Sequence, residues 1–548
     1  MAKASNARTA ARLAGEDGRL PAFSPRKRAV DKKAERLAAA REAAGSLLES
    51  PLQSVERLKN RMSLAHGISY LKNSEVLRFV PHAHAALRRR LLKSPTRTLS
   101  GVSPIALMPP PSPCPGRCIY CPRGENAPQS YTGFEPTTMR AIECGYSATR
   151  QVEMRLGQYR GQGHGTDKCH LIVMGGTFLC SPADGQQAFM KEAFEVLNGK
   201  KARTLRSAID ANETARHRAI GVTFETRPDF GMEREADAML SMGGTQVELG
   251  VQSLSDAVYR RVLRGHTVSD VARSSAILRD SGFKLCYHMM PGLFATPKQD
   301  ADYFRRLFSD SRFQPDMVKI YPVLVMRGTP LHAMWKRGEF SPYSTEEAAE
   351  AIADATRFLP PYVRVPRIQR DIPSPLVCAG VKNSNLRQIV DGLLRKRGEK
   401  CRCIRCREVG SGERTGKATG KLKLEMKRID YAASGGKEIF LSFEDAEKDL
   451  VAGFLRLRAP AQPHREELEA SSVVRELHVY GQEAAIGERS EGKEQHKGLG
   501  AALLAEAERI SHGEMGMEKI SVLSGPGARG YYRKSGYALV GPYMQKKL

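Results

Sequence analysis

Short apolar runs recur through the middle of the chain, and a polar, helix-like segment separates each run from the next. Short apolar runs bounded by turn signals are typical of strands that are buried on both faces. The six runs are 105–108 (IALM), 171–174 (LIVM), 220–224 (IGVTF), 246–251 (QVELGV), 284–290 (KLCYHMM) and 317–321 (MVKIY). Strands that alternate with helices form a parallel sheet, so the pattern predicts an incomplete (β/α)6 barrel, with its site at the C-terminal ends of the strands.

Other patterns flank this region. The first ninety-odd residues are mainly helical, as in AERLAAAREAAGSLLES, whereas SVVRELHVY and KISVLSG near the end of the chain alternate as strands. Between these two strands, Leu499, Leu503, Ala507 and Ile510 fall on one helical face. We therefore predict an α/β protein with four parts: a basic helical region (1–95), the barrel (96–370), a basic, glycine-rich linker (371–420) and a small α/β unit (421–548).

Charge is concentrated at the beginning of the chain. The 548 residues carry a formal net charge of +26, and residues 1–100 hold 21 Lys and Arg against 8 Asp and Glu, a net charge of +13. Such a field attracts polyanions by counterion release, so nucleic acid is the leading partner and an anionic membrane surface the second. A solvated arm that only aids solubility explains a basic terminus equally well.

Composition narrows the cellular setting. No apolar run approaches the roughly 18 residues that a membrane span requires. The acidic residues Glu16, Asp17, Asp31 and Glu35 argue against a transit peptide. Six of the eleven cysteines lie in two tight clusters, which suits metal binding in a reducing compartment better than disulfides. We therefore expect a cytoplasmic protein that no membrane anchors.

The first cysteine cluster is Cys114, Cys118 and Cys121, in the stretch SPCPGRCIYCPRG directly after the first predicted strand. A structural zinc site normally has four protein ligands, so a trio leaves one coordination position open. A cubane iron–sulfur cluster held by three cysteines likewise leaves one iron free to bind a ligand. Zinc, or a redox pair with a spare cysteine, is the alternative.

This spacing, together with the glycine pair Gly175 and Gly176 after the next strand, resembles the radical S-adenosylmethionine (SAM) enzymes. The resemblance implies that Cys114, Cys118 and Cys121 hold a [4Fe–4S] cluster. It also implies that the free iron chelates SAM and that the glycines let the backbone approach this cofactor.

A second motif opens the predicted helix near the C-terminus. The stretch QHKGLG, 495–500, offers consecutive backbone N–H groups, a helix N-terminus and Lys497, all of which suit a pyrophosphate. Its order, strand, glycine loop, strand and then GARGYYRKSGY, resembles the GNAT acyl-CoA fold. That fold implies backbone donors to the thioester from the strand before the loop and a tyrosine near the sulfur. Tyr532 is our preferred candidate and Tyr531 the second; one core and one surface aromatic is the plain alternative.

The combination of the two modules resembles the catalytic subunit family of Elongator, in its archaeal and bacterial single-chain form. The stretches that carry the resemblance are QSYTGFEPTTMRA, DKCHLIVMGGTF, TFETRPD, VELGVQS, RGHTVSDV, HMMPGL, KIYPVLV, IQRDIPSPL, CRCIRCREVG and YYRKSGY through GPYM. The resemblance implies a transferase that uses a SAM-derived radical and acetyl-CoA to place a carboxymethyl group on C5 of the wobble uridine of tRNA. An electron donor is then required; a homodimer is possible, and nothing is predicted about accessory subunits.

Carried over residue by residue, the resemblance implies roles for several further positions. Lys168 matches a family lysine tied to acetyl-CoA. Glu248 and Gln252, on one face of a strand, are candidates for the cofactor ribose, and a buried carboxylate and amide paired to neighbours is the alternative. The predicted acetyl-CoA residues are Glu476, Leu477, His478, Val479, Gln495, Lys497, Gly498, Leu499, Gly500 and Tyr532.

The second cysteine cluster, Cys401, Cys403 and Cys406, resembles the linker zinc site of this family, with Cys378 or a histidine as the fourth ligand and a redox-active trio as the alternative. One departure is Arg123, which stands where family members commonly have the first glycine of Cys-Pro-Gly-Gly.

We expect the cluster site and the acetyl-CoA site to face one shared cavity. The competing functions are a protein lysine acetyltransferase with a structural cluster domain, and an RNA-binding scaffold with vestigial cofactor sites.

Overall fold

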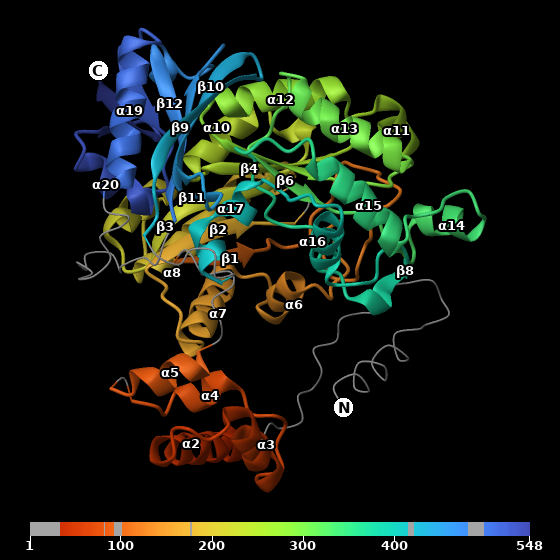
Figure 1. Cartoon of the computed structure of the whole chain (residues 1–548), viewed down its shortest axis with the longest axis vertical. Coiled ribbons are helices and arrows are strands. Elements are labelled where there is room, and N and C mark those ends of the chain that lie inside the picture. The colour runs from red at the N-terminus through yellow and green to blue at the C-terminus, as the bar shows by residue number, and fades with distance from the viewer. Residues whose placement is uncertain (1–32, 82, 93–100, 176–177, 415–420, 481–497) are drawn as a thin grey trace.

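The computed structural model describes residues 33–81, 83–92, 101–175, 178–414, 421–480 and 498–548. Six parallel strands form the centre of the molecule (Figure 1), in the order of the sequence. They are β1 (Val102–Leu107), β2 (Lys168–Val173), β3 (Arg218–Thr226), β4 (Gln246–Gln252), β5 (Lys284–Met289) and β6 (Met317–Ile320). All six predicted strands and their parallel pairing are confirmed, and because β1 does not pair with β6 among the described residues, the barrel is incomplete.

Helices cover the outside of this sheet. They are α6 (Pro136–Glu143), α7 (Ala148–Gly161), α8 (Ala183–Asn198), α9 (Leu205–Ala211), α10 (Glu233–Ser241), α11 (Asp256–Arg261), α12 (Val268–Asp280), α13 (Pro297–Ser309) and α15 (Thr345–Thr356). Helix α14 (Pro330–Lys336) instead projects away from the sheet (Figure 1). Capping hydrogen bonds fix the first residues of several helices. At the start of α12, the Thr267 hydroxyl accepts from the N–H of Asp270, and the Asp270 carboxylate accepts from the N–H of Thr267. Short 3-10 helices are η1 (Phe178–Cys180), η2 (Asn212–Thr214), η3 (Pro228–Phe230), η4 (Ser374–Leu376), η5 (Glu466–Leu468) and η7 (Pro526–Ala528).

The register of the strands gives the barrel a polar lumen. Neighbouring residues in a parallel ladder point to the same face of the sheet. One level of the lumen therefore contains Thr223, Gln246 and Lys284, and the next contains Glu225, Glu248 and Cys286. The alternate residues of the same strands are apolar and pack against the surrounding helices; examples are Val222, Phe224, Val247, Leu249 and Leu285.

The described N-terminal residues fold into four helices, α2 (Lys33–Glu49), α3 (Val55–Ala65), α4 (Asn73–Leu77) and α5 (Ala85–Leu91). They extend from the barrel beside α7 (Figure 1). Their apolar side chains form a core of their own, built from residues such as Ala43, Leu47, Leu58, Leu71 and Val76. The predicted helical character is confirmed for this part of the region.

The segment predicted as a linker begins with structure that belongs to the barrel. Strand β8 (Val377–Ala379) pairs with β7 (Val325–Met326), and α16 (Leu386–Lys396) packs against α15. Two short helices follow, α17 (Ile404–Arg407) and α18 (Val409–Arg414). The structured barrel thus continues past residue 370, because an apolar face of α16 that includes Val390 and Leu394 is buried there.

A mixed seven-stranded sheet forms the C-terminal unit, in the order β14-β15-β13-β12-β11-β10-β9. Its strands are β9 (Glu425–Ala433), β10 (Gly436–Asp445), β11 (Leu450–Ala459), β12 (Ser471–Val479), β13 (Lys519–Val522), β14 (Ala538–Val540) and β15 (Tyr543–Lys547); its helices are α19 (Leu499–Gly513) and α20 (Arg529–Arg533). The two predicted strands and the predicted apolar helix face are confirmed: Leu503, Ala507 and Ile510 are buried. The antiparallel strands β9 to β11 were not predicted.

Buried charges join this sheet to the barrel. Arg475 of β12 donates to both carboxylate oxygens of Asp316, at 2.7 and 2.8 Å, and to Glu438 at 2.7 Å. Arg279 at the end of α12 donates to Glu438 at 3.0 Å. None of these charges is left without an opposite partner, which is the condition under which buried ions are tolerated.

No helix among the described residues is both long and apolar enough to span a bilayer.

Candidate active site

The first cysteine cluster lies in the loop after β1, at the C-terminal mouth of the barrel. Cys114, Cys118 and Cys121 line one cavity of about 180 Å³ with side chains from the ends of β3, β4, β5 and β6. Backbone bonds hold the loop from two sides: the N–H of Ile119 donates to Val262 O at 3.1 Å, and the N–H of Leu331 donates to Ile119 O at 3.0 Å. The three thiols therefore converge where the barrel fold places catalytic groups.

Two buried arginines face the thiols. Arg264 donates to Sγ of Cys118 at 3.5 Å. Arg227 pairs with Asp229 through Nε and Nη2, at 2.9 and 2.8 Å, while its Nη1 is buried without a hydrogen-bond partner among the described residues. Nη1 lies 2.1 Å from the position of a Cβ on Gly116, so a side chain there would require the guanidinium to move. An unpaired buried donor beside three thiols indicates a missing anionic partner. A thiolate-ligated iron–sulfur cluster fits this donor set and these cations.

The departure at Arg123 is accommodated because its side chain is exposed. The next residue has no such freedom: a Cβ on Gly124 would lie 2.3 Å from the carbonyl oxygen of Thr132. The second glycine of the family pattern is thus the one that this backbone requires.

Of the predicted glycine pair, Gly175 follows β2 with φ at 121°, a conformation that favours glycine. A Cβ there would lie 3.3 Å from Pro109, which follows β1. Gly176 lies outside the described residues. Gln252 ends β4 with φ at 71° and lines the cavity, as does Glu248.

Ion pairs form the floor of the cavity. Glu248 Oε2 contacts Lys319 Nζ and lies 2.6 Å from His288 Nε2. Burial by itself raises the pKa of Glu248, but the charge of Lys319 and the bond to His288 outweigh it, so this pKa lies well below its usual range. Glu248 therefore is a buried carboxylate paired to its neighbours, which the sequence analysis gave as the alternative to a ribose contact. The neighbouring Glu225 accepts a hydrogen bond from Tyr131 at 3.2 Å.

Several cavity residues received no role from the sequence, although the motifs quoted above contain them. They are Arg227, Arg264, Lys319 and Arg370. Arg370 donates to the carbonyl oxygen of Ser130 at 2.7 Å and so fixes the loop after the cysteines. Arginines and lysines far apart in the chain give no local signal that they will meet; only the repeated position at a strand end points to them.

The predicted acetyl-CoA residues of β12 lie at the opposite, N-terminal mouth of the barrel. A bulge at Arg475 interrupts the β11 ladder, and Glu476 to Val479 continue it. On the other edge, β13 pairs only with residues 471–474, so residues 476–479 have no ladder partner there among the described residues. Lys168 begins β2 at this same mouth. Burial lowers the pKa of His478 to about 4, and the charges of Arg364, Lys284 and Lys168 contribute to this decrease.

The helix after the glycine loop starts beside β12. Gly498 precedes α19 with φ at 91°, and Leu499 begins the helix. A Cβ on Gly500 would lie 3.0 Å from the Tyr531 hydroxyl and 3.6 Å from the Val479 side chain. The fold thus brings Val479, Gly500 and Tyr531 together, whereas Gln495 and Lys497 lie outside the described residues.

Tyr532, the preferred candidate, and Tyr531 lie in different environments. Tyr532 is buried in the core of the C-terminal unit with Leu503, Ala507 and Ile520. Tyr531 is 43% exposed, and its hydroxyl is the one beside Gly500. The sequence offered two adjacent aromatics, and they lie on different sides of α20. The role of Tyr532 near the thioester stays a prediction, and the hydroxyl beside Gly500 favours Tyr531 for the same role.

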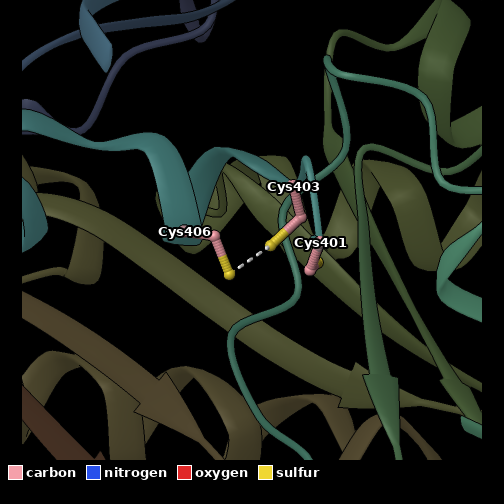
Figure 2. Close-up of side chains that lie close together, drawn as sticks. All are labelled: Cys401, Cys403 and Cys406. Carbon is pink, nitrogen blue, oxygen red and sulfur yellow. Dashed lines mark hydrogen bonds between the residues drawn. The ribbon is translucent and has the colours of Figure 1, made fainter. Parts of the chain in front are cut away.

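The second cysteine cluster lies at the start of α17 (Figure 2): Cys403 is the N-cap of this helix and Cys406 lies within it. Sulfur atoms of Cys401, Cys403 and Cys406 all lie within 4.8 Å of one another, and the Sγ atoms of Cys403 and Cys406 are 3.7 Å apart. Three convergent thiols suit a thiophilic metal such as zinc. Among the described residues, Cys378 does not join this group, and no histidine does.

The expected shared cavity is not observed. None of the described residues that line the cavity comes from residues 421–548. The two candidate sites instead lie at opposite mouths of one barrel, with the polar lumen between them. A parallel sheet has two ends, and the sequence pattern does not tell which end a second unit covers.

Comparisons with known proteins identify the barrel region. Residues 108–307 match the radical SAM superfamily, and residues 315–396 match the radical SAM C-terminal domain. The fold and the cysteine loop therefore define a radical SAM protein.

Full-length relatives are more specific. The chain is 48% identical over 462 residues to the tRNA uridine(34) acetyltransferase of Dehalococcoides mccartyi. The aligned region covers 83% of this chain and 100% of that protein. It is 41% identical to Elongator complex protein 3 of Danio rerio, over 90% of this chain and 93% of that one. The structure of Methanocaldococcus infernus Elp3 with an N-terminal deletion superposes with a TM-score of 0.73 at 42% identity, covering 82% of this chain and 100% of that one. The chain belongs to the Elongator complex protein 3 family.

Proposed function

We propose that this chain is a tRNA-modifying transferase that uses a SAM-derived radical and acetyl-CoA to place a carboxymethyl group on C5 of the wobble uridine. The observation that carries the proposal is the convergence of Cys114, Cys118 and Cys121 on one cavity with two buried cations. Membership of a family whose relatives are named for tRNA uridine 34 supplies the substrate. The acetyltransferase name of those relatives supplies the second co-substrate.

In the cluster site, the three thiolates would hold a [4Fe–4S] cluster, and Arg227 and Arg264 would balance its charge. When bound, this cluster supplies the electron that cleaves SAM, so an external one-electron donor is required. Gly175 and Gly176 would let the cofactor approach the backbone. Glu248 and Gln252, at the floor and side of the cavity, are the proposed ribose contacts.

In the C-terminal unit, we assign a GNAT-type acetyl-CoA site to the open edge of Glu476, Leu477, His478 and Val479. The start of α19 at Gly498, Leu499 and Gly500 would receive the pyrophosphate, with Gln495 and Lys497 before it. Tyr531 would lie near the thioester sulfur, and Lys168 would approach the same ligand from the barrel. The contact of Gly500 with Val479 and Tyr531 supports this assignment, because it joins three elements that the proposal needs together.

The N-terminal helices are the proposed tRNA-binding region. Among the side chains that the structure describes there, six exposed ones are basic: Arg41, Arg57, Arg61, Lys72, Arg78 and Arg90. Separate exposed cations on a small independent core are suited to phosphates rather than to base edges. We propose structural zinc for Cys401, Cys403 and Cys406, whose three sulfurs converge.

The test is the modification itself. Protein with a reconstituted cluster is incubated with SAM, a reductant, acetyl-CoA and uridine-34 tRNA, and digested tRNA is analysed by mass spectrometry for the added carboxymethyl group. We expect product from the wild type, none from Cys118→Ser and wild-type amounts from Cys144→Ser, a buried cysteine outside both clusters. Labelled acetyl on protein lysine without tRNA product would favour a protein acetyltransferase; tRNA binding without SAM cleavage or acetyl-CoA hydrolysis would favour a scaffold.

A further inference from the structure

Strand β5 begins at the point where the C-terminal sheet divides. The β12–β13 ladder ends at Val474 and Val522, where the N–H of Leu523 donates to Val474 O at 3.2 Å. Gly282, just before β5, is wedged there: its Cβ would lie 3.0 Å from Val473 and 3.2 Å from Leu523. The N-terminal mouth of the barrel is therefore inserted between the two diverging strands.

Both chain neighbours of Lys284 are fixed to β12. Arg475 Nη1 donates to Phe283 O at 3.0 Å and to Asp316 Oδ2 at 2.7 Å. The N–H of Leu285 donates to the same oxygen of Asp316 at 2.8 Å. With the backbone held on both sides and Leu285 in the outer core, alternation directs the side chain of Lys284 into the lumen. Its orientation is thus set by the residue that immediately precedes Glu476.

Lys284 has a charge but no direct partner at this mouth. Its ammonium makes no hydrogen bond or ion pair with the described residues, whereas Lys319 at the other mouth is bound to Glu248. Its charge and that of Arg456 offset the effect of burial on Glu476 and lower the pKa of that carboxyl. On the same strand, His478 Nε2 is buried without a partner within the described part of the chain. An unpaired cation and an unpaired ring nitrogen beside an open strand edge indicate a polar ligand.

We propose that Lys284 donates a hydrogen bond to the carbonyl oxygen of the acetyl thioester held along the open edge of β12, with the acetyl methyl directed into the lumen. This inference rests on the proposed function, since it needs acetyl-CoA at β12. During hydrolysis, water adds to the carbonyl carbon and the C–S bond breaks; one proton of the water passes to the departing sulfur and the other to solvent, which gives free CoA and acetate. Lys284 stabilises the negative charge that develops on the oxygen and transfers no proton itself.

The experiment compares Lys284→Met, Lys284→Arg and Lys200→Met, the last being an exposed lysine after α8. Acetyl-CoA hydrolysis with tRNA present is measured by steady-state kinetics, and binding of CoA, which lacks the acetyl group, by calorimetry. We expect kcat to fall on the order of 100-fold in Lys284→Met, with CoA affinity within about twofold of wild type. Lys284→Arg regains part of the rate because it keeps a donor cation, and Lys200→Met matches wild type.

Two results would overturn the proposal: kcat of Lys284→Met within about threefold of wild type, or CoA affinity that falls in parallel with kcat, which shows a structural role. Lys284→Gln, which keeps a polar head of smaller size, replaces the methionine variant if that one unfolds, and the same two criteria apply. If the wild type itself neither binds CoA nor hydrolyses acetyl-CoA, the proposed function fails, and this outcome is distinct from a failure of Lys284 alone.

Discussion

At the C-terminal mouth of the barrel the lumen lysine is neutralised, and at the N-terminal mouth it is not. Lys319 contacts Glu248, which also accepts from His288, and the group closes the floor of the cysteine-lined cavity. Lys284 is held just as firmly through its backbone but meets no direct counter-ion among the described residues. The same residue type, on adjacent strands of one barrel, thus has two different environments.

The difference teaches how to separate structural charge from charge available to a ligand. A buried pair such as Glu248 and Lys319 satisfies itself, and removing one member leaves the other uncompensated. An unpaired cation fixed by its backbone is poised for something that the chain does not supply. On this criterion, Lys284 at the divided sheet is a ligand-facing cation, whereas Arg227 at the cysteine loop pairs with Asp229 and offers a ligand only its Nη1 donor.

The largest expected effect concerns Arg227 and its glycine. In Gly116→Ala the new Cβ collides with Arg227 Nη1, so the guanidinium must move from its place beside the thiols, and we expect a loss of bound iron and sulfide after reconstitution. Gly157→Ala is the control, since nothing lies within 4 Å of a Cβ at that position in α7. Iron analysis and the visible absorption of the cluster measure the effect. Full cluster content in Gly116→Ala would show that the loop does not need this contact.

Removing Lys319 from the ion pair at the cavity floor should destabilise the protein more than removing Lys284. Lys319→Met leaves Glu248 buried without its cation, and we expect a loss of about 3–5 kcal/mol in the free energy of unfolding. Glu248→Gln in the same chain should restore much of this loss. Lys284→Met should cost less than about 1 kcal/mol, because no direct partner is lost. Denaturant titrations of the four proteins decide the matter, and equal losses for both lysines would abolish the distinction.

Acid should destabilise the lumen between its two mouths. His170 Nε2 and the Thr223 hydroxyl form a hydrogen bond of 2.7 Å. Burial, together with the charge of Lys284, lowers the pKa of His170 to about 4. The unfolded chain takes up this proton near pH 6.5, so the stabilisation is complete above that value and decreases as pH falls toward 4. The loss between pH 7 and pH 5 is about 2 kcal/mol. His170→Gln should therefore show a shallower decrease than wild type in urea midpoints over this range; parallel curves would contradict the assignment.

The smallest effect distinguishes the two adjacent tyrosines. Tyr531→Phe removes the hydroxyl beside Gly500, and we expect kcat for acetyl-CoA hydrolysis to fall about tenfold, typical of one lost hydrogen bond near a reacting group. Tyr532→Phe alters only a core position and should leave kcat within about twofold. Steady-state rates at matched protein stability provide the measurement. The reverse order would return the role to Tyr532.

Local pattern was sufficient for much of the fold. All six barrel strands and the apolar face of α19 follow from periodicity, because a buried strand or helix face needs apolar residues at regular positions whatever it packs against. The cysteine trio was visible for a similar reason: its ligands lie in one short loop. Strands β9 to β11, which lie inside the predicted α/β unit, were not predicted; β9 (Glu425–Ala433) carries mainly exposed charged residues and so has no apolar run to mark it.

What the sequence by itself determined, then, is the six barrel strands, the helix and flanking strands of the C-terminal unit, the cysteine loop and the family to which the chain belongs. Only the tertiary structure decided that β12 covers the N-terminal mouth of the barrel, that Tyr531 rather than Tyr532 reaches the helix start, and that Lys319 is paired while Lys284 is not. The physical reason is the separation along the chain over which each kind of signal acts. Periodicity and loop motifs act over a few residues, whereas Arg475 meets Asp316 across 159 positions of the chain. Such contacts exist only once both units have folded against each other.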